Sequence, residues 1–165
     1  MKIILIGFMG SGKTVVAKKL ASKLAVKCLE MDQEIIQMTG CRNMAEFFAK
    51  RGELLLREWE IRLAKEYSTL NDVIISTGGG VILNKINLDY LKQNNGTVIF
   101  LDTPFSVIVN RLKSDTTPRP LFKNRKQAEK LFNFRLPLYR QYADYIVNTD
   151  HKSVVQIVEI INKII

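Results

Sequence analysis

Short apolar runs alternate with longer amphipathic stretches along the chain. The apolar runs predict five strands, at Lys2–Ile6, Lys27–Met31, Val73–Thr77, Thr97–Asp102 and Tyr145–Asn148. The first, third and fourth are continuous and rich in β-branched residues, as expected of strands that are buried on both faces. Apolar residues recur at helical spacing in Lys13–Leu24, Glu53–Tyr67 and Ser153–Ile164. This alternation predicts an α/β fold in which helices cover both faces of a parallel sheet.

The length and composition fit a single folded domain over residues 1–165. Of the 165 residues, 47% are apolar, which is enough for a sizeable core and too many for a disordered chain. The two cysteines, Cys28 and Cys41, form no CxxC motif and no cluster with histidine, so we expect neither a disulfide scaffold nor a zinc site. No apolar run approaches the roughly 18 residues of a membrane span, and the first is too short for a secretion signal. We therefore expect a soluble, cytoplasmic protein.

The positive charge is concentrated in one part of the chain. The net charge is +9, and the segment from Phe105 to Tyr145 has nine basic and three acidic residues, which is +6 of that total. A basic segment suits an anionic ligand such as a nucleotide, a nucleic acid, or a phosphorylated or carboxylated metabolite. It is equally compatible with an ordinary solvated surface, so the charge alone leaves both interpretations open.

A phosphate-binding motif directly follows the first predicted strand. Residues 7–14, Gly-Phe-Met-Gly-Ser-Gly-Lys-Thr, satisfy the pattern GxxxxGK[ST]. Glycines let such a loop wrap around phosphates with its backbone N–H groups pointing inward, and the next helix adds its positive end. Lys13 should reach the β- and γ-phosphates, and the Thr14 hydroxyl should bind Mg²⁺. The position between an apolar strand and an amphipathic helix is the context that this motif requires.

A second glycine cluster, Gly78-Gly79-Gly80, follows the third predicted strand. Three consecutive glycines are entropically costly, and we expect them to let a ligand approach the backbone closely. Loops at the carboxyl ends of parallel strands form the ligand sites of such folds. Both glycine clusters should therefore open onto one crevice.

Two acidic residues lie at the end of the second predicted strand. Alternation should turn Glu30 and Asp32 to the same side, toward that crevice. A carboxylate there could hold Mg²⁺-bound water or accept a proton from a substrate hydroxyl. Asp32 could also be the N-cap of a helix that begins there, and the two roles are compatible.

Three arginines are candidates for binding anions. Arg57 and Glu60 are three residues apart on one predicted helix and could form a pair, although such pairs are common on ordinary surfaces. Arg119 lies between two prolines on an expected exposed loop and could stabilise charge during phosphoryl transfer. Arg135 could bind a carboxylate through two hydrogen bonds. Charge alone does not separate these roles from a surface position.

Taken in order, these motifs resemble those of the shikimate kinases, a family of small P-loop kinases that are similar to nucleoside-monophosphate kinases. The resemblance covers nearly the whole chain and includes residues 7–14, Glu30, Asp32, Gly40, Ala45–Phe48, Gly52, Glu53, Arg57, Glu60, Ser76–Gly80, Leu101–Pro104, Arg111, Arg119–Leu121, Arg135 and Tyr139. It implies a three-layer P-loop fold with a five-stranded parallel sheet in the order 2-3-1-4-5. It also implies ATP-dependent phosphorylation of the 3-hydroxyl of shikimate to shikimate 3-phosphate, a step toward chorismate and the aromatic amino acids.

The resemblance also implies a role for each candidate residue. The catalytic residues would be Lys13, Asp32 and Arg119. The ATP-binding residues would be Gly10, Ser11, Gly12, Lys13, Thr14, Val15, Arg119 and Arg111, the last against the adenine. Shikimate would be bound by Asp32, Arg57, Gly78, Gly79, Gly80 and Arg135, with Glu60 orienting Arg57. Thr14 would bind Mg²⁺ directly, and Glu30 and Asp32 would bind it through water. Residues 32–60, approximately, would form a shikimate-binding region, and a lid at about 112–125 would exclude water.

The chain departs from the family pattern at a few positions, and two alternatives stay open. Glu30 stands where the family usually has aspartate, and Leu56 stands where phenylalanine often precedes the arginine. One alternative is another small-metabolite kinase of the same fold, such as a gluconate kinase. The other is a nucleic-acid-binding P-loop protein, although aromatic residues do not interleave with the basic segment as a single-strand platform requires. We expect small-molecule substrates, no nucleic-acid or membrane partner, and a monomer.

Overall fold

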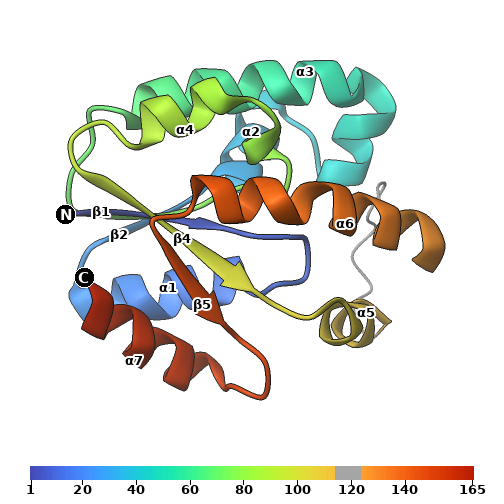
Figure 1. The fold of residues 1–165 in the computed structure, drawn as a ribbon. Helices are drawn as coiled ribbons and strands as arrows, with labels where there is room; N and C mark the ends of the chain where they lie inside the picture. The colour runs from blue at the N-terminus through green and yellow to red at the C-terminus, as the bar shows by residue number, and fades with distance from the viewer. Residues whose placement is uncertain (114–123) are drawn as a thin grey trace.

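The computed structural model describes residues 1–113 and 124–165. Its centre is a parallel five-stranded sheet in the order β2-β3-β1-β4-β5 (Figure 1). The strands are β1 (Lys2–Ile6), β2 (Lys27–Glu30), β3 (Val73–Ser76), β4 (Gly96–Asp102) and β5 (Tyr145–Asn148). The fold class, the strands and the strand order expected from the sequence are confirmed, and the strand ends differ from the expected ones by at most one residue.

Helices cover both faces of this sheet and form three layers with it (Figure 1). On one face lie α1 (Lys13–Leu24) and α7 (Val154–Ile164). The other face is covered by α2 (Met31–Thr39), α3 (Met44–Tyr67), α4 (Lys85–Leu91), α5 (Phe105–Lys113) and α6 (Arg125–Tyr142), with a short 3-10 helix at Val81–Leu83. In the described parts of the chain, no helix has the length and hydrophobicity that a membrane crossing needs.

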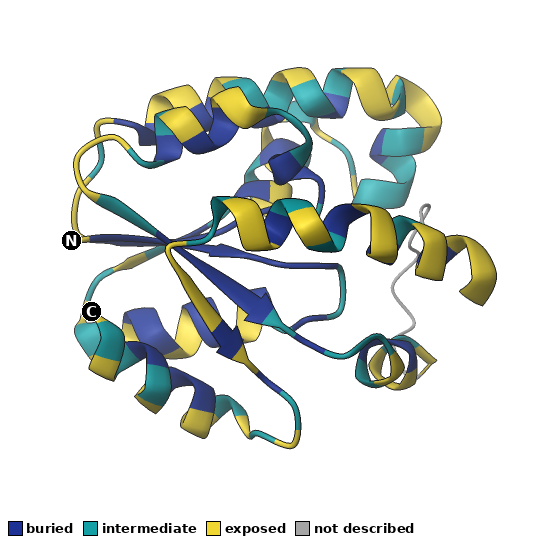
Figure 2. Cartoon of the chain, viewed as in Figure 1, coloured by how far each residue is buried: buried dark blue, intermediate teal, exposed yellow. Residues whose placement is uncertain are grey.

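The alternation of side chains along β1 divides the core into two parts. Ile3 and Leu5 pack toward α1 and α7, whereas Ile4 and Ile6 pack toward α2 to α6. All four side chains are completely buried, as expected for the central strand of a sheet that is covered on both faces. Figure 2 shows the buried central strands inside the molecule and exposed residues on the outer sides of the helices.

One helix runs further than the sequence pattern indicated, and α6 was not expected from it. The helix expected at Glu53–Tyr67 begins at Met44, where the Asn43 side chain caps it by accepting from Glu46 N at 2.9 Å. Gly52 interrupts it with φ 76° and ψ 172°, a conformation that favours glycine and kinks the helix. Helix α6 continues through Pro137, which is why a reading that ends helices at proline does not find it.

Candidate phosphate and acceptor site

The loop between β1 and α1 has the conformation of a phosphate-binding loop. Gly10 and Gly12 have φ of 78° and 94°, which favour glycine. Ser11 N donates to Phe8 O at 3.1 Å and closes the turn. Helix α1 begins directly afterwards at Lys13, so its positive end faces the loop. The local sequence thus produces the strand, loop and helix arrangement that the motif predicted.

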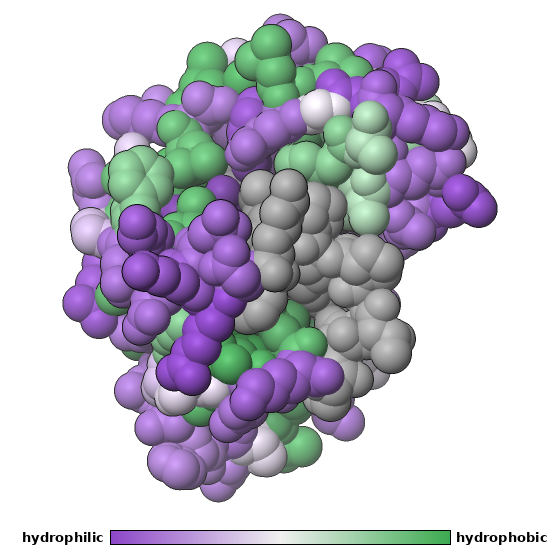
Figure 3. Space-filling view, turned by 90° about the vertical axis from the view of Figure 1, so that its right-hand side faces the viewer, coloured by the Kyte–Doolittle hydropathy of each residue, from purple (hydrophilic) through white to green (hydrophobic). Residues whose placement is uncertain are grey.

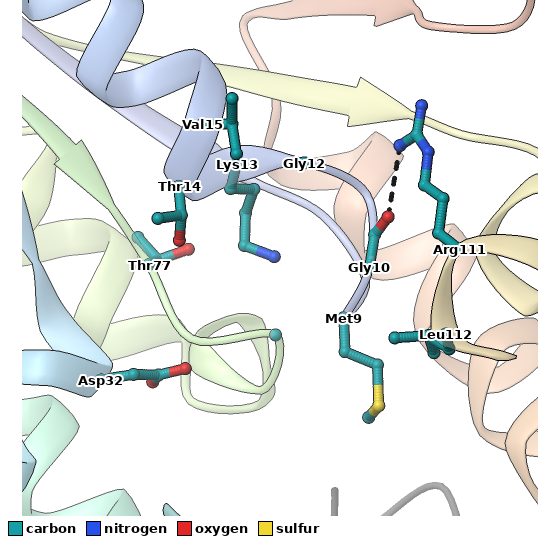
Figure 4. Close-up of a pocket in the computed structure, with 11 residues that line it drawn as sticks. Met9, Gly10, Gly12, Lys13, Thr14, Val15, Asp32, Thr77, Arg111 and Leu112 are labelled. Atoms are coloured by element: carbon teal, nitrogen blue, oxygen red, sulfur yellow. Dashed lines mark hydrogen bonds between the residues drawn. The ribbon is translucent and has the colours of Figure 1, made fainter. Parts of the chain in front are cut away.

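The Lys13 side chain lies inside this loop. Its Nζ donates to Gly7 O at 2.8 Å and to Phe8 O at 3.0 Å, and the residue is 7% exposed. An ammonium group at the centre of the loop is placed to approach an anion that enters it. In Figure 4 the side chain points into the open space in front of the loop.

That space is a pocket of about 290 Å³, which is lined by the loop, the start of α1, the first turn of α2, the residues after β3 and the end of α5. Asp32 and Thr77 lie on one side of it and Arg111 on the other (Figure 4). Its lining consists of Met9, Gly10, Gly12, Lys13, Thr14, Val15, Asp32, Thr77, Gly79, Arg111 and Leu112. Both glycine clusters therefore contribute to one pocket, as the sequence predicted.

Most of the expected nucleotide-binding residues meet at this pocket. Arg111 Nη1 donates to Gly10 O and to Ser11 O, both at 3.2 Å, and so joins α5 to the loop. The exposed Thr14 hydroxyl lies 3.5 Å from Ser76 Oγ at the end of β3. Ser11 belongs to the loop, but its side chain is buried and does not line the pocket.

The expectation that Glu30 and Asp32 face the same side is wrong. Strand β2 ends at Glu30, and α2 begins at Met31, so the two residues are not related by strand alternation. Asp32 lies in the first turn of α2 and lines the pocket, whereas the Glu30 carboxylate pairs with Lys18 Nζ at 2.7 Å and does not line it. The N-cap of α2 is Glu30, so the capping role considered for Asp32 is also wrong.

The glycine triplet is required mainly by nearby side chains of the protein itself. A Cβ on Gly78 would lie 2.7 Å from Asp32 Oδ1 and 2.9 Å from Glu60 Oε1. A Cβ on Gly80 would lie 2.1 Å from Arg57 Nη1. We expected a ligand to approach all three glycines, but of the three only Gly79 lines the pocket. The triplet is what allows two carboxylates and a guanidinium to gather beside it.

Arg57 lies between two carboxylates of its own helix. Its Nη1 donates to Glu60 Oε2 at 2.7 Å, and its Nη2 donates to Glu53 Oε1 at 2.6 Å. The side chain of Glu60 is 1% exposed. Burial raises the pKa of Glu60 to about 7, although the charge of Arg57 opposes the shift. The expected Arg57–Glu60 pair is thus present, and it is buried rather than on the surface.

Arg135 joins α6 to the glycine triplet. The residue is 2% exposed, and its Nη1 donates to Gly79 O at 3.2 Å. The Tyr139 hydroxyl, one turn further along α6, donates to the same oxygen. Burial lowers the pKa of the Arg135 guanidinium, but an arginine remains charged in proteins. A buried cation beside Arg57 is suited to an anionic group of a ligand.

Two residues of this site were not assigned a role from the sequence. Glu53 precedes Arg57 by four residues, and Tyr139 follows Arg135 by four residues. The i, i+4 spacing was a usable signal for Glu53. For Tyr139 it was not, because the helix that contains it includes Pro137.

Three basic residues of the segment from Phe105 to Tyr145 have specific positions within the protein. Arg111 lines the pocket, Arg135 is buried, and Arg140 pairs with Asp102 at 3.3 Å. Hydrophilic residues make up most of the described surface in Figure 3, and hydrophobic ones form separate patches. Arg119 and its two neighbouring prolines lie outside the described residues, as does most of the expected lid.

The arrangement can place two anionic groups near one carboxylate. The loop with Lys13 suits a phosphate chain, and the buried guanidinium groups of Arg57 and Arg135 suit a second anion on the other side of Gly79. Asp32 lines the pocket beside the glycine triplet, between these two groups of residues, and is placed to accept a hydrogen bond or a proton from a hydroxyl. This geometry fits phosphoryl transfer to a small acceptor that carries both an anionic group and a hydroxyl.

Known proteins resemble this chain in sequence and in structure. Residues 9–165 match the family model of shikimate kinase. A shikimate kinase of Persephonella marina is 40% identical over 163 residues, which cover 98% of this chain and 98% of the relative. The structure of a shikimate kinase from Acinetobacter baumannii in complex with shikimate has a TM-score of 0.91 at 32% identity, covering 99% of this chain and 91% of that one. A deoxyadenosine kinase from M. mycoides with bound dATP has a TM-score of 0.70 at 16% identity over 99% of each chain, which shows a shared fold.

Proposed function

The chain belongs to the shikimate kinase family, and from this premise we propose how its residues bind the two substrates and transfer the phosphoryl group. The protein is an enzyme, a phosphotransferase with an alcohol group as acceptor, and it phosphorylates shikimate. The reaction is the transfer of the γ-phosphoryl group of ATP to the 3-hydroxyl of shikimate. The comparisons give no support to the gluconate-kinase-like alternative.

ATP binds with its phosphates in the loop between β1 and α1. Backbone N–H groups from Gly10 to Val15 surround the phosphates, and Lys13 Nζ exchanges its two carbonyl partners for β- and γ-phosphate oxygens. Arg111 lies across the pocket from Asp32 and packs against the adenine. We assign Arg119 to the stabilisation of charge on the transferred group from its sequence context and family resemblance alone.

The residues at the pocket fit Mg²⁺ that is held mainly by substrate phosphates. Mg²⁺ keeps several waters, so such a site needs only a few protein ligands, here a hydroxyl and one or two carboxylates. Thr14 and Asp32 both line the pocket and supply these oxygen ligands, Thr14 directly and Asp32 through water. When bound, Mg²⁺ neutralises charge that develops on the phosphates. Glu30 is excluded from this proposal because its carboxylate pairs with Lys18.

Shikimate binds on the other side of Gly79. Arg57 and Arg135 hold its carboxylate, and Glu60 keeps the Arg57 guanidinium in place through the 2.7 Å contact. Gly78 and Gly80 give these side chains room, and Gly79 contacts the substrate. Asp32 accepts a hydrogen bond from the 3-hydroxyl and takes its proton as the oxygen attacks the γ-phosphorus.

The observation that carries this proposal is the position of Gly79 between the two halves of the site. Gly79 lines the pocket that contains Lys13, and the Gly79 carbonyl oxygen accepts hydrogen bonds from Arg135 and Tyr139. A substrate whose carboxylate meets Arg57 and Arg135 is therefore held beside the phosphate loop, as catalysis by positioning requires.

The test is ADP release from Mg-ATP in a coupled assay with shikimate, gluconate or a nucleoside monophosphate as acceptor. We expect release that depends on shikimate and is near background with the other two. Release with gluconate instead would keep the phosphate loop and discard the substrate. Equal release with no acceptor would contradict a transfer role for the Arg57 and Arg135 half of the site.

We also propose a monomer in the cytoplasm that has no nucleic-acid partner. The monomer is supported because the pocket and the acceptor site are formed within one chain. The absence of a nucleic-acid partner is supported because several residues of the basic segment have specific partners within the protein. Binding to random DNA that weakens steeply with salt would contradict the absence of a nucleic-acid partner.

A further inference from the structure

Arg57, which we propose to bind the substrate carboxylate, already pairs with two carboxylates of its own helix. Its two terminal nitrogens are both occupied, Nη1 by Glu60 at 2.7 Å and Nη2 by Glu53 at 2.6 Å. Arg57 Nε is buried and has no hydrogen-bond partner among the described residues. A carboxylate that binds a guanidinium through two hydrogen bonds uses two adjacent nitrogens, and here either adjacent pair includes Nη2. Nη2 carries two N–H groups, so the substrate carboxylate either replaces Glu53 there or shares the nitrogen with it, and sharing would bring two carboxylates together on one nitrogen.

The two carboxylates on Arg57 differ in how firmly they are held. The side chain of Glu60 is 1% exposed, whereas that of Glu53 is 46% exposed. Glu53 also directly follows Gly52, the residue with non-helical φ and ψ that kinks α3. An exposed ion pair contributes little free energy because water and salt compete for both charges. Glu53 can therefore leave Arg57 at small cost, and Glu60 cannot.

We propose that Glu53 occupies the carboxylate position of the acceptor site when that site is empty, and that the substrate carboxylate replaces it on Arg57. This inference rests on the proposed function of the site. Glu53 is then a positioning residue that keeps the guanidinium paired and aligned between turnovers, and it competes with the substrate for the same nitrogen.

The balance of charge around Arg57 supports the replacement. The acceptor site contains three carboxylates, on Asp32, Glu53 and Glu60, and two guanidinium groups, on Arg57 and Arg135. A substrate that adds a fourth carboxylate would meet repulsion if Glu53 stayed in place. Rotation of Glu53 into solvent removes one negative charge and restores the original balance.

The test is the affinity for shikimate of the variant Glu53→Gln, measured directly as well as by kinetics. Trp59 is the only tryptophan of the chain and lies two residues after Arg57 on α3, so its fluorescence can report binding without turnover. We expect the Kd and the KM for shikimate to fall about two- to fivefold, the range that exposed ion pairs support. The kcat and the KM for ATP should stay as in the wild type.

Glu58→Gln is the matched control, because Glu58 is exposed on the same helix and pairs with no described residue. It should bind shikimate as the wild type does, and Glu53→Ala should reproduce the tighter binding of Glu53→Gln. Unchanged or weaker binding in both Glu53 variants, while the wild type binds shikimate, overturns this inference and leaves the proposed function standing. A wild-type protein that does not respond to shikimate overturns both.

Discussion

The Arg57 guanidinium lies directly against the backbone of Gly80. A Cβ on Gly80 would be 2.1 Å from Arg57 Nη1 and 2.4 Å from Nη2, closer than unbonded atoms can come. Gly80 has φ −105° and ψ 0°, which other residues also adopt, so space and not backbone freedom requires the glycine. One hydrogen atom in place of a methyl group thus decides where the guanidinium can lie.

We expect Gly80→Ala to displace Arg57 and to raise the KM for shikimate by about tenfold, because a forced overlap typically costs about 1–3 kcal/mol. The KM for ATP should change little, since neither residue lines the nucleotide pocket. The control is a double-mutant cycle with Arg57→Ala, in which Gly80→Ala should add almost nothing. Additive losses would show that the methyl group acts elsewhere.

Lys13→Ala should abolish phosphoryl transfer and also lower the stability of the fold. The Lys13 ammonium group is the expected contact to the β- and γ-phosphates, so we expect kcat to fall by at least about 100-fold. Its Nζ also satisfies the carbonyl groups of Gly7 and Phe8, and leaving these unpaired costs about 1–3 kcal/mol. The measurements are kcat and urea unfolding, with the exposed Lys19→Ala as control. Full activity would remove the phosphate loop from the mechanism.

Asp32→Asn should affect turnover far more than nucleotide affinity. The amide cannot take the proton of the acceptor hydroxyl, and general bases typically contribute about 100- to 10,000-fold. We expect kcat to fall by that order while the KM for ATP stays within about twofold. Glu30→Gln is the comparison, since the Glu30 carboxylate pairs with Lys18 outside the pocket and its loss should leave kcat nearly unchanged. A larger loss in Glu30→Gln would reverse the two assignments.

The elements that fix the fold could be predicted because their signals are local. The buried strands are continuous apolar runs, and the phosphate loop is contiguous in sequence, so both were found with ends correct to about one residue. Whether Glu30 and Asp32 face the same side depends on where β2 stops, and that stop is set by the start of α2 at Met31. A one-residue error in a strand end is enough to reverse such a prediction.

The acceptor half of the site was harder to predict because it depends on contacts between distant elements. Nothing local in the glycine triplet indicates that Arg57 and Glu60 of α3 pack against it from one side and Tyr139 of α6 from another. The residues themselves made Arg57, Glu60 and Arg135 candidates, the family resemblance supplied their roles, and the packing explains why the glycines accompany them. The function proposed for Glu53 arises only through its competition with a ligand, which sequence patterns do not describe.

The buried carboxyl of Glu60 should make stability depend on pH in a window where few other groups titrate. Burial raises the pKa of Glu60 from its usual 4.5 to about 7, the nearby Asp32 adds to this, and Arg57 and Arg135 oppose it. Because the folded pKa is the higher one, the folded state binds more protons between these values. The contribution is fully present below pH 4.5 and is lost as pH rises through 7.

We expect the free energy of unfolding of the wild type to fall by roughly 2–3 kcal/mol between about pH 5 and pH 8 through this group, measured by urea unfolding. In Glu60→Gln this component should vanish, whereas Glu58→Gln should keep it. A wild type that becomes more stable over this window would show that the ion pair with Arg57 outweighs the burial of the Glu60 carboxyl.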